Sequence, residues 1–153
     1  MQLGLILPHL GASQLSYLAI HHANHMNRQG NPVILFYEDL VEPCIPLISP
    51  CMNVNEIWGF DGLLIATSID SCLAMINAPN PSKKVFYVWD LEWLRGKTDF
   101  EYNNRAYRHE KVELVCRSES HADILENYSN RRATVIPDLF LPKFVELFVP
   151  KAI

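Results

Sequence analysis

The stretch that decides the fold is residues 3–37, LGLILPHLGASQLSYLAIHHANHMNRQGNPVILFY. Residues 3–7 form an apolar run that ends at Pro8, as a buried strand does, and residues 32–37 form a second such run. Between them apolar residues recur at helical spacing from Gln14 to Gln29, with Ser13 at the N-cap position and Gly30 at the C-terminal end. Strand, helix and strand in this order predict a βαβ unit with parallel, right-handed pairing.

The rest of the chain repeats this alternation. Strands are predicted at 62–67, 83–89, 112–116 and 133–136, and helices at 68–77, 99–109 and 119–128. A connection containing Pro43, Pro46 and Pro50 interrupts regular structure. Near-continuous apolar strands are typical of a parallel sheet covered on both faces, so we predict an α/β protein, a single Rossmann-like three-layer domain with a mostly parallel sheet of about six strands.

Length and composition favour one domain. The chain has 153 residues, of which 49% are hydrophobic and 20% charged, which suits one core and excludes global disorder. We expect residues 1–138 to form the domain. Residues 139–153 are predicted to be an apolar tail, whose segment from Leu139 to Val149 packs on the domain, on a second copy, or on a separate protein.

Charge and hydropathy exclude several classes of function. A formal net charge of −4 disfavours nucleic-acid binding. The sequence has no apolar run long enough to span a membrane and no signal peptide, so we expect a cytoplasmic protein with reduced cysteines. The four cysteines lack C-x-x-C spacing, and His21 and His25 have no evident third ligand, so no metal site is predicted.

Ligands of an open parallel sheet bind at the carboxyl ends of the strands. The first of these ends carries Gly11, Ala12 and Ser13 at a helix start, where backbone N–H groups would face an anion or simply form a tight turn with an N-cap. The G-x-G-x-x-G pattern and a P-loop lysine are missing, which disfavours a nicotinamide or ATP site. His9, at the tip of the first strand, is a candidate base or substrate contact.

A second candidate lies after the aromatic strand, where Trp89, Asp90, Glu92 and Trp93 stand together. Carboxylates accept hydrogen bonds from sugar hydroxyls while aromatic rings cover apolar sugar faces, so this pattern favours a carbohydrate. Two carboxylates would also suit a divalent cation, but a third ligand is lacking. The remaining interpretation is a solvated strand end with a helix-capping acid.

Three segments resemble the N-terminal, acceptor-side domain of GT-B glycosyltransferases. The first is Ile65-Ala66-Thr67-Ser68, and the second is the strand from Lys84 to Glu92 with its acidic end. The third runs from Val115 through Ser118 and Glu119 to Asp123, and continues with Thr134-Val135-Ile136-Pro137-Asp138. The last of these is similar to the family's sequence of strand, Ser-Glu, helix and Val-Ile-Pro-Asn.

The resemblance implies hexosyl transfer from a nucleotide sugar, with no resident cofactor. His9, Asp90 and Glu92 are the implied catalytic residues; the implied substrate-binding residues are Gly11, Ala12, Ser13, Trp89, Trp93, Ser118 and Glu119. The family's paired glycines are replaced by Gly11-Ala12, and the donor-binding lobe would begin near Pro137. We therefore expect weak or no transferase activity unless a second polypeptide supplies that lobe.

Two other hypotheses keep the fold. The chain is a non-catalytic binding or structural module that assembles through the apolar tail, or an unrelated flavodoxin-like or nucleotide-binding domain. A bound flavin or nucleotide in the purified protein would identify the latter.

Overall fold

The computed structural model describes residues 2–79, 83–96 and 99–140. In these residues seven strands form one sheet in the order β3-β2-β1-β4-β5-β6-β7, and all neighbouring strands are parallel. The strands are β1 (Leu3–Leu7), β2 (Val33–Tyr37), β3 (Cys51–Asn53), β4 (Leu63–Ala66), β5 (Lys83–Val88), β6 (Glu113–Cys116) and β7 (Thr134–Val135). Because the pairing is parallel, the carboxyl ends of all strands lie at one edge.

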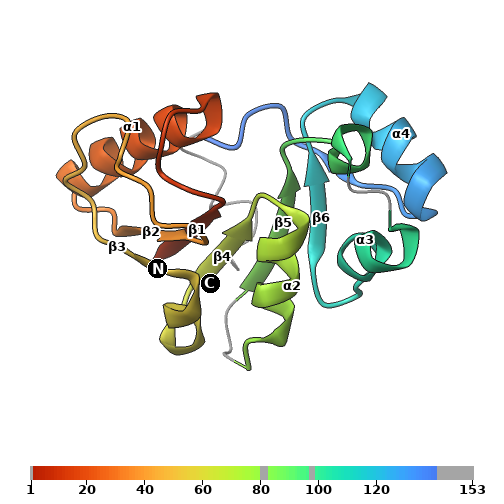
Figure 1. Ribbon diagram of the computed structural model, residues 1–153, viewed down its shortest axis with the longest axis horizontal. Helices are drawn as coiled ribbons and strands as arrows, with labels where there is room; N and C mark the ends of the chain where they lie inside the picture. The colour runs from red at the N-terminus through yellow and green to blue at the C-terminus, as the bar shows by residue number, and fades with distance from the viewer. Residues whose placement is uncertain (1, 80–82, 97–98, 141–153) are drawn as a thin grey trace, which may run out of the picture.

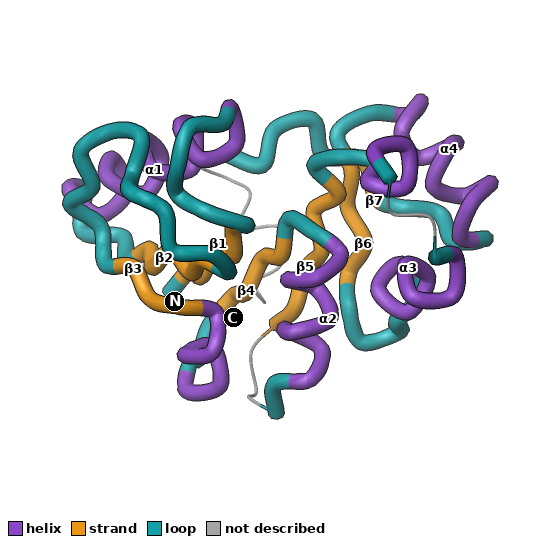
Figure 2. The backbone as a smooth tube through the Cα atoms, in the orientation of Figure 1, coloured by secondary structure: helices purple, strands orange, loops and turns teal. Residues whose placement is uncertain are grey.

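Helices connect the strands and cover the sheet (Figure 1). They are α1 (Gln14–Arg28), the 3-10 helix η1 (Val54–Gly59), α2 (Ile69–Asn77), the 3-10 helix η2 (Glu92–Arg95), α3 (Phe100–Tyr107) and α4 (Glu119–Ser129). Figure 2 shows the strands grouped centrally, with α1 near β1 and β2, and with α3 and α4 at the end of the sheet near β6 and β7. No helix in the described residues is long and apolar enough to cross a bilayer.

Alternate strand residues feed two core clusters, one on each face of the sheet. On one face Leu5 packs in a cluster with Ala19 and Ile20 of α1. On the other face Ile6 belongs to the cluster that contains residues of α2, α3 and α4. Both strand residues are at most 2% exposed. The layers are therefore helix, sheet and helix, which confirms the predicted Rossmann-like α/β class.

Every strand and helix named in the sequence analysis is present, and the structure adds β3. This strand follows the proline-rich connection and pairs with β2, with Cys51 opposite Leu35. Cys51 and Met52 are exposed, so the strand has no apolar pattern and is held by its backbone pairing at the edge of the sheet. An edge strand of this kind leaves little signal in a sequence.

Asn24 of α1 anchors the proline-rich connection. The residue is buried, with only 6% of its surface exposed. Its Nδ2 group donates to the carbonyl of Pro46 at 2.9 Å, and its Oδ1 atom accepts from the backbone N–H groups of Ile48 and Ser49 and from the Ser49 hydroxyl. One asparagine thus replaces the regular hydrogen bonds that the prolines prevent.

The C-terminal segment begins by packing on the domain. Leu139 is 4% exposed and belongs to the α1-side cluster, and the Phe140 ring lies 5.3 Å from that of His22 and 6.2 Å from that of Trp89. Residues 141–153, which carry the rest of the predicted apolar tail, lie outside the described residues.

Candidate functional site

The strand order reverses between β1 and β4, because the chain extends from β1 through β2 to β3 and then returns to the other side of β1. A crevice opens at the carboxyl edge of an open α/β sheet at such a point, and ligands bind there. The loops that follow β1, β4 and β5 end at this edge. His9 lies in the loop after β1 and Asp90 in the loop after β5, so both are at this edge.

A pocket of about 460 Å³ lies at this edge, and we call it the carboxyl-edge pocket. Its lining comes from three places: the β1–α1 turn, the loop after β5, and the end of β6. The residues are Pro8, His9, Ser13, Gln14, Leu15, Ser16, Trp89, Asp90, Arg95 and Arg117. Four of the residues predicted from the sequence, His9, Ser13, Trp89 and Asp90, thus share one cavity.

The β1–α1 turn fixes His9 through two hydrogen bonds. The ring Nδ1 atom accepts from the backbone N–H of Gly11 at 3.0 Å, and the backbone carbonyl accepts from the Ser16 hydroxyl at 2.7 Å. Because Nδ1 is an acceptor, the neutral ring carries its proton on Nε2. A side chain at Gly11 would collide with Val41, whose Cγ1 atom lies 2.6 Å from where its Cβ would be.

Ser13 is the N-cap of α1, as predicted. Its backbone is extended, and its hydroxyl oxygen accepts from the backbone N–H of Ser16 at 3.0 Å. The backbone N–H groups of Gln14 and Leu15 have no acceptor among the described residues, and the first turn contains no acidic residue. The positive end of the α1 dipole therefore lies at the pocket with no acidic residue in its own first turn.

Trp89 and Arg117 hold each other in place. The Nη2 group of Arg117 donates to the carbonyl of Trp89, and its guanidinium carbon lies 5.0 Å from the centre of the Trp89 ring. A cation over an indole face is attracted by the ring's quadrupole. Arg117 follows β6 directly, but a single arginine at a strand end has no motif that would have singled it out.

The side chains of Asp90 and Glu92 lie in different surroundings. Asp90 lines the pocket and forms a long ion pair with Arg95 at 3.7 Å; the side chains of the two residues are 40% and 75% exposed, respectively. The Oε2 atom of Glu92 instead accepts a hydrogen bond from the backbone N–H of Ile69 at 2.7 Å, at the start of α2. Of the two acids, only Asp90 lines the cavity.

Trp93, Ser118, Glu119 and Ala12, which were also predicted from the sequence, lie elsewhere. Trp93 stacks on Tyr128 with ring centres 3.9 Å apart. Ser118 caps α4 by accepting from the backbone N–H of His121 at 3.1 Å, and Glu119 pairs with Arg132 at the surface. Ala12 is exposed beside the first loop. The carboxyl-edge pocket contains none of these four residues.

Two titrating groups near the edge have shifted pKa values. Burial lowers the pKa of His121, and the charge of Arg117 lowers it further, while Asp90 opposes both effects. Burial raises the pKa of Tyr87 to about 12, and its hydroxyl donates to the carbonyl of Ile136 at 2.8 Å. Both groups are therefore neutral at pH 7, and the formal charge of the edge comes from arginines and carboxylates.

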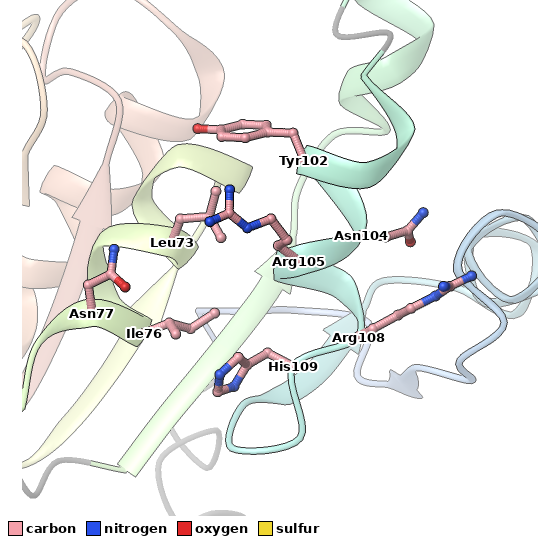
Figure 3. A pocket seen from close by; sticks show the side chains of 8 residues that line it. All are labelled: Leu73, Ile76, Asn77, Tyr102, Asn104, Arg105, Arg108 and His109. Atoms are coloured by element: carbon pink, nitrogen blue, oxygen red, sulfur yellow. The ribbon is translucent and has the colours of Figure 1, made fainter.

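A second cavity of about 560 Å³ lies between α2 and α3. Its lining residues are Leu73, Ile76, Asn77, Tyr102, Asn104, Arg105, Arg108 and His109. Figure 3 shows the Arg105 side chain reaching toward α2, whereas Arg108 points away from it. No residue predicted as functional lines this groove. Within the described residues, moreover, no three His, Cys, Asp or Glu side chains gather in a way that would hold a metal ion.

No protein-family model matches the chain, and neither a curated protein nor a solved structure does.

Proposed function

We propose that the chain is a glycosyltransferase-like domain that binds a carbohydrate in the carboxyl-edge pocket, as the acceptor-side half of a GT-B sugar transferase. The observation that carries the proposal is the convergence of His9, Trp89 and Asp90 on one cavity of about 460 Å³. These residues come from two strand ends that are far apart in the sequence. A volume of this order suits a small ligand.

The chemistry of the lining fits a sugar. Asp90 offers carboxylate oxygens to hydroxyl groups, and the indole of Trp89, over which the Arg117 guanidinium lies, would offer its remaining apolar surface to a pyranose ring. His9 is held with Nδ1 as an acceptor, so its neutral ring has a proton to donate at Nε2. In a transferase this N–H would hold the acceptor sugar by donating to one of its oxygens; with Nδ1 already accepting from Gly11, the ring has no free nitrogen to take the proton of the attacking hydroxyl.

Transfer also needs a donor held in register with the acceptor, and much of the rate gain comes from that positioning. The described residues form one Rossmann-like unit, whereas a GT-B transferase uses two. We therefore expect the chain by itself to release nucleotide from UDP-glucose slowly or not at all. Rapid turnover by the purified chain would contradict this part of the proposal.

The alternative is a sugar-binding module without transferase chemistry. Glu92 caps α2, so the pocket contains one carboxylate and not the expected acidic pair. This arrangement favours the module without transferase chemistry. Under this alternative, the segment from Leu139 to Val149 would bind a second copy of the chain or a separate protein. Adding a donor-lobe protein would restore nucleotide release under the first proposal and leave it unchanged under the second.

Binding is tested by titrating the chain with glucose, mannose and UDP-glucose while the tryptophan fluorescence and the backbone NMR shifts around Trp89 are recorded. Asp90→Ala should weaken binding about tenfold, since it removes charge-assisted hydrogen bonds. Asp61→Ala, which removes an exposed carboxylate outside the pocket, is the matched control. The proposal fails if none of the three ligands binds, or if the two variants bind alike.

A further inference from the structure

The carboxyl-edge pocket is electropositive in a protein that is acidic overall. The chain has a formal net charge of −4. The formally charged side chains of the pocket are Arg95, Arg117 and Asp90, which leaves one positive charge in excess. A neutral sugar requires no such excess. The excess positive charge of the lining therefore favours a negatively charged ligand.

Of the two cations, Arg117 is the one held in a fixed position. Its guanidinium lies over the Trp89 ring and donates to the Trp89 carbonyl, whereas Arg95 is 75% exposed and reaches Asp90 at only 3.7 Å. The Nε atom of Arg117 is buried and has no hydrogen-bond partner among the described residues. Arg117 as a whole is only partly buried, and no carboxylate in the described part of the chain forms an ion pair with it, so the guanidinium N–H groups at the pocket wall remain available to an anionic ligand.

The backbone at the start of α1 adds further positive charge to the pocket. The first two N–H groups of α1 have no acceptor in the described part of the chain, and α1 begins at the pocket with no acid in its first turn. The end of a helix of this length carries roughly half a positive charge. Two different features of the pocket thus have the same sign: the excess of one arginine in the lining, and the start of α1.

We propose that the sugar bound in this pocket is acidic and that Arg117 binds its carboxylate, with Asp90 left to accept hydroxyl groups. The inference rests on the proposed function, because it names the class of carbohydrate for that site. A hexuronate carries one negative charge, which matches the excess of one in the lining. A sugar phosphate carries roughly −1.5 to −2, which exceeds it and places more charge beside Asp90.

The planar guanidinium suits this role, since its N–H groups are arranged as a fork that fits the two oxygens of a carboxylate. One Nη2 hydrogen is used by the Trp89 carbonyl, so the ring-stacked guanidinium is oriented before the ligand arrives. Preorganisation of this kind reduces the entropy lost on binding.

The test compares glucose, glucuronate and glucose 6-phosphate by calorimetry on the full chain. We expect glucuronate to bind about tenfold more tightly than glucose at low salt, and the difference to shrink as salt is added. In Arg117→Gln the ratio of the two affinities should fall to about one, and Arg117→Lys should retain part of it, because lysine keeps the charge and loses the fork. Arg105→Gln, in the groove between α2 and α3, should leave the ratio unchanged.

Each contrary result has a distinct meaning. Equal binding of glucose and glucuronate overturns the acidic-sugar inference and leaves the proposed function standing. Preference for glucose 6-phosphate overturns the choice of a carboxylate, and an unchanged ratio in a folded Arg117→Gln overturns the role of Arg117. If none of these three ligands binds, and mannose and UDP-glucose do not bind either, the proposed function itself fails.

Discussion

Glu92 caps helix α2: its Oε2 atom accepts a hydrogen bond from the backbone N–H of Ile69 at 2.7 Å. The capping is additional to that of Ser68, whose side chain accepts from the backbone N–H of Ser71 at 3.1 Å. Negative charge at a helix N-terminus is stabilising. Asp90 and Glu92 are only two residues apart, but they have different roles: Glu92 stabilises the fold, and Asp90 lines the cavity.

We predict that Glu92→Ala lowers the free energy of unfolding by about 1–2 kcal/mol, because a half-buried backbone donor loses its charged acceptor. Asp90→Ala should change it by less than about 0.5 kcal/mol, since its ion pair with Arg95 is largely exposed. Urea denaturation of both variants measures the difference. Equal stabilities would show that the Glu92 contact contributes nothing.

The proline-rich connection should depend on one side chain. We predict that Asn24→Ala destabilises the protein by about 2–3 kcal/mol, because it leaves the Ser49 amide and hydroxyl without their buried acceptor. Asn55→Ala, at an exposed position in η1, is the matched control and should stay within about 0.5 kcal/mol of the parent. Denaturant unfolding gives both values, and hydrogen exchange at Ser49 should accelerate only in Asn24→Ala. Unchanged exchange there would contradict the anchoring role.

The sheet could be predicted from the sequence because its central strands are apolar on both faces. The edge strand Cys51–Asn53 could not, since two of its three residues are exposed. Parallel pairing also predicted that the ends of β1 and β5 would share an edge, which brought His9 and Asp90 to one pocket. The direction of the Glu92 side chain depends on the turn into η2, and no local pattern encodes that turn.

Arg117 was missed for a related reason. Its position follows from the length of β6, but its role depends on contact with Trp89, which is 28 residues away in the chain. Hydrophobic periodicity reports burial and contains no information on such pairings. Tertiary contacts between polar side chains are therefore the part of the site that only the three-dimensional structure reveals.

The hydroxyl of Tyr102 donates to the Oδ1 atom of Asp70 at 2.6 Å, and this hydrogen bond is the main reason why the pKa of Tyr102 rises to about 12. The unperturbed pKa is 10.0, so the neutral phenol stabilises the fold below pH 10, and this contribution is lost as the pH rises toward about 12. The difference in tyrosinate absorbance between the parent and Tyr102→Phe measures the titration. Asp70→Asn should move the Tyr102 pKa back toward 10, and an unchanged titration in that variant would contradict the assignment.

His22 provides a test at the acidic end of the pH range. Burial lowers its pKa from 6.5, the charge of His25 lowers it further, and Asp138 opposes both. Because the unfolded chain takes up this proton more readily than the folded one, the stability that neutral His22 contributes is present above pH 6.5 and is lost as the pH falls. The His22 ring lies 5.3 Å from that of Phe140, so protonation should also loosen the packing of Phe140 on α1.

We therefore predict that stability falls more steeply below pH 6.5 in the parent than in His22→Gln, which has no titrating ring at this position. His21→Gln, which removes an exposed histidine one residue away, should follow the parent. Unfolding curves between pH 7 and 5 give the stabilities, and the NMR signals of the Phe140 ring report its packing over the same range. If His22→Gln and the parent lose stability in parallel while the Phe140 signals stay constant, protonation of His22 does not affect the packing of the C-terminal segment.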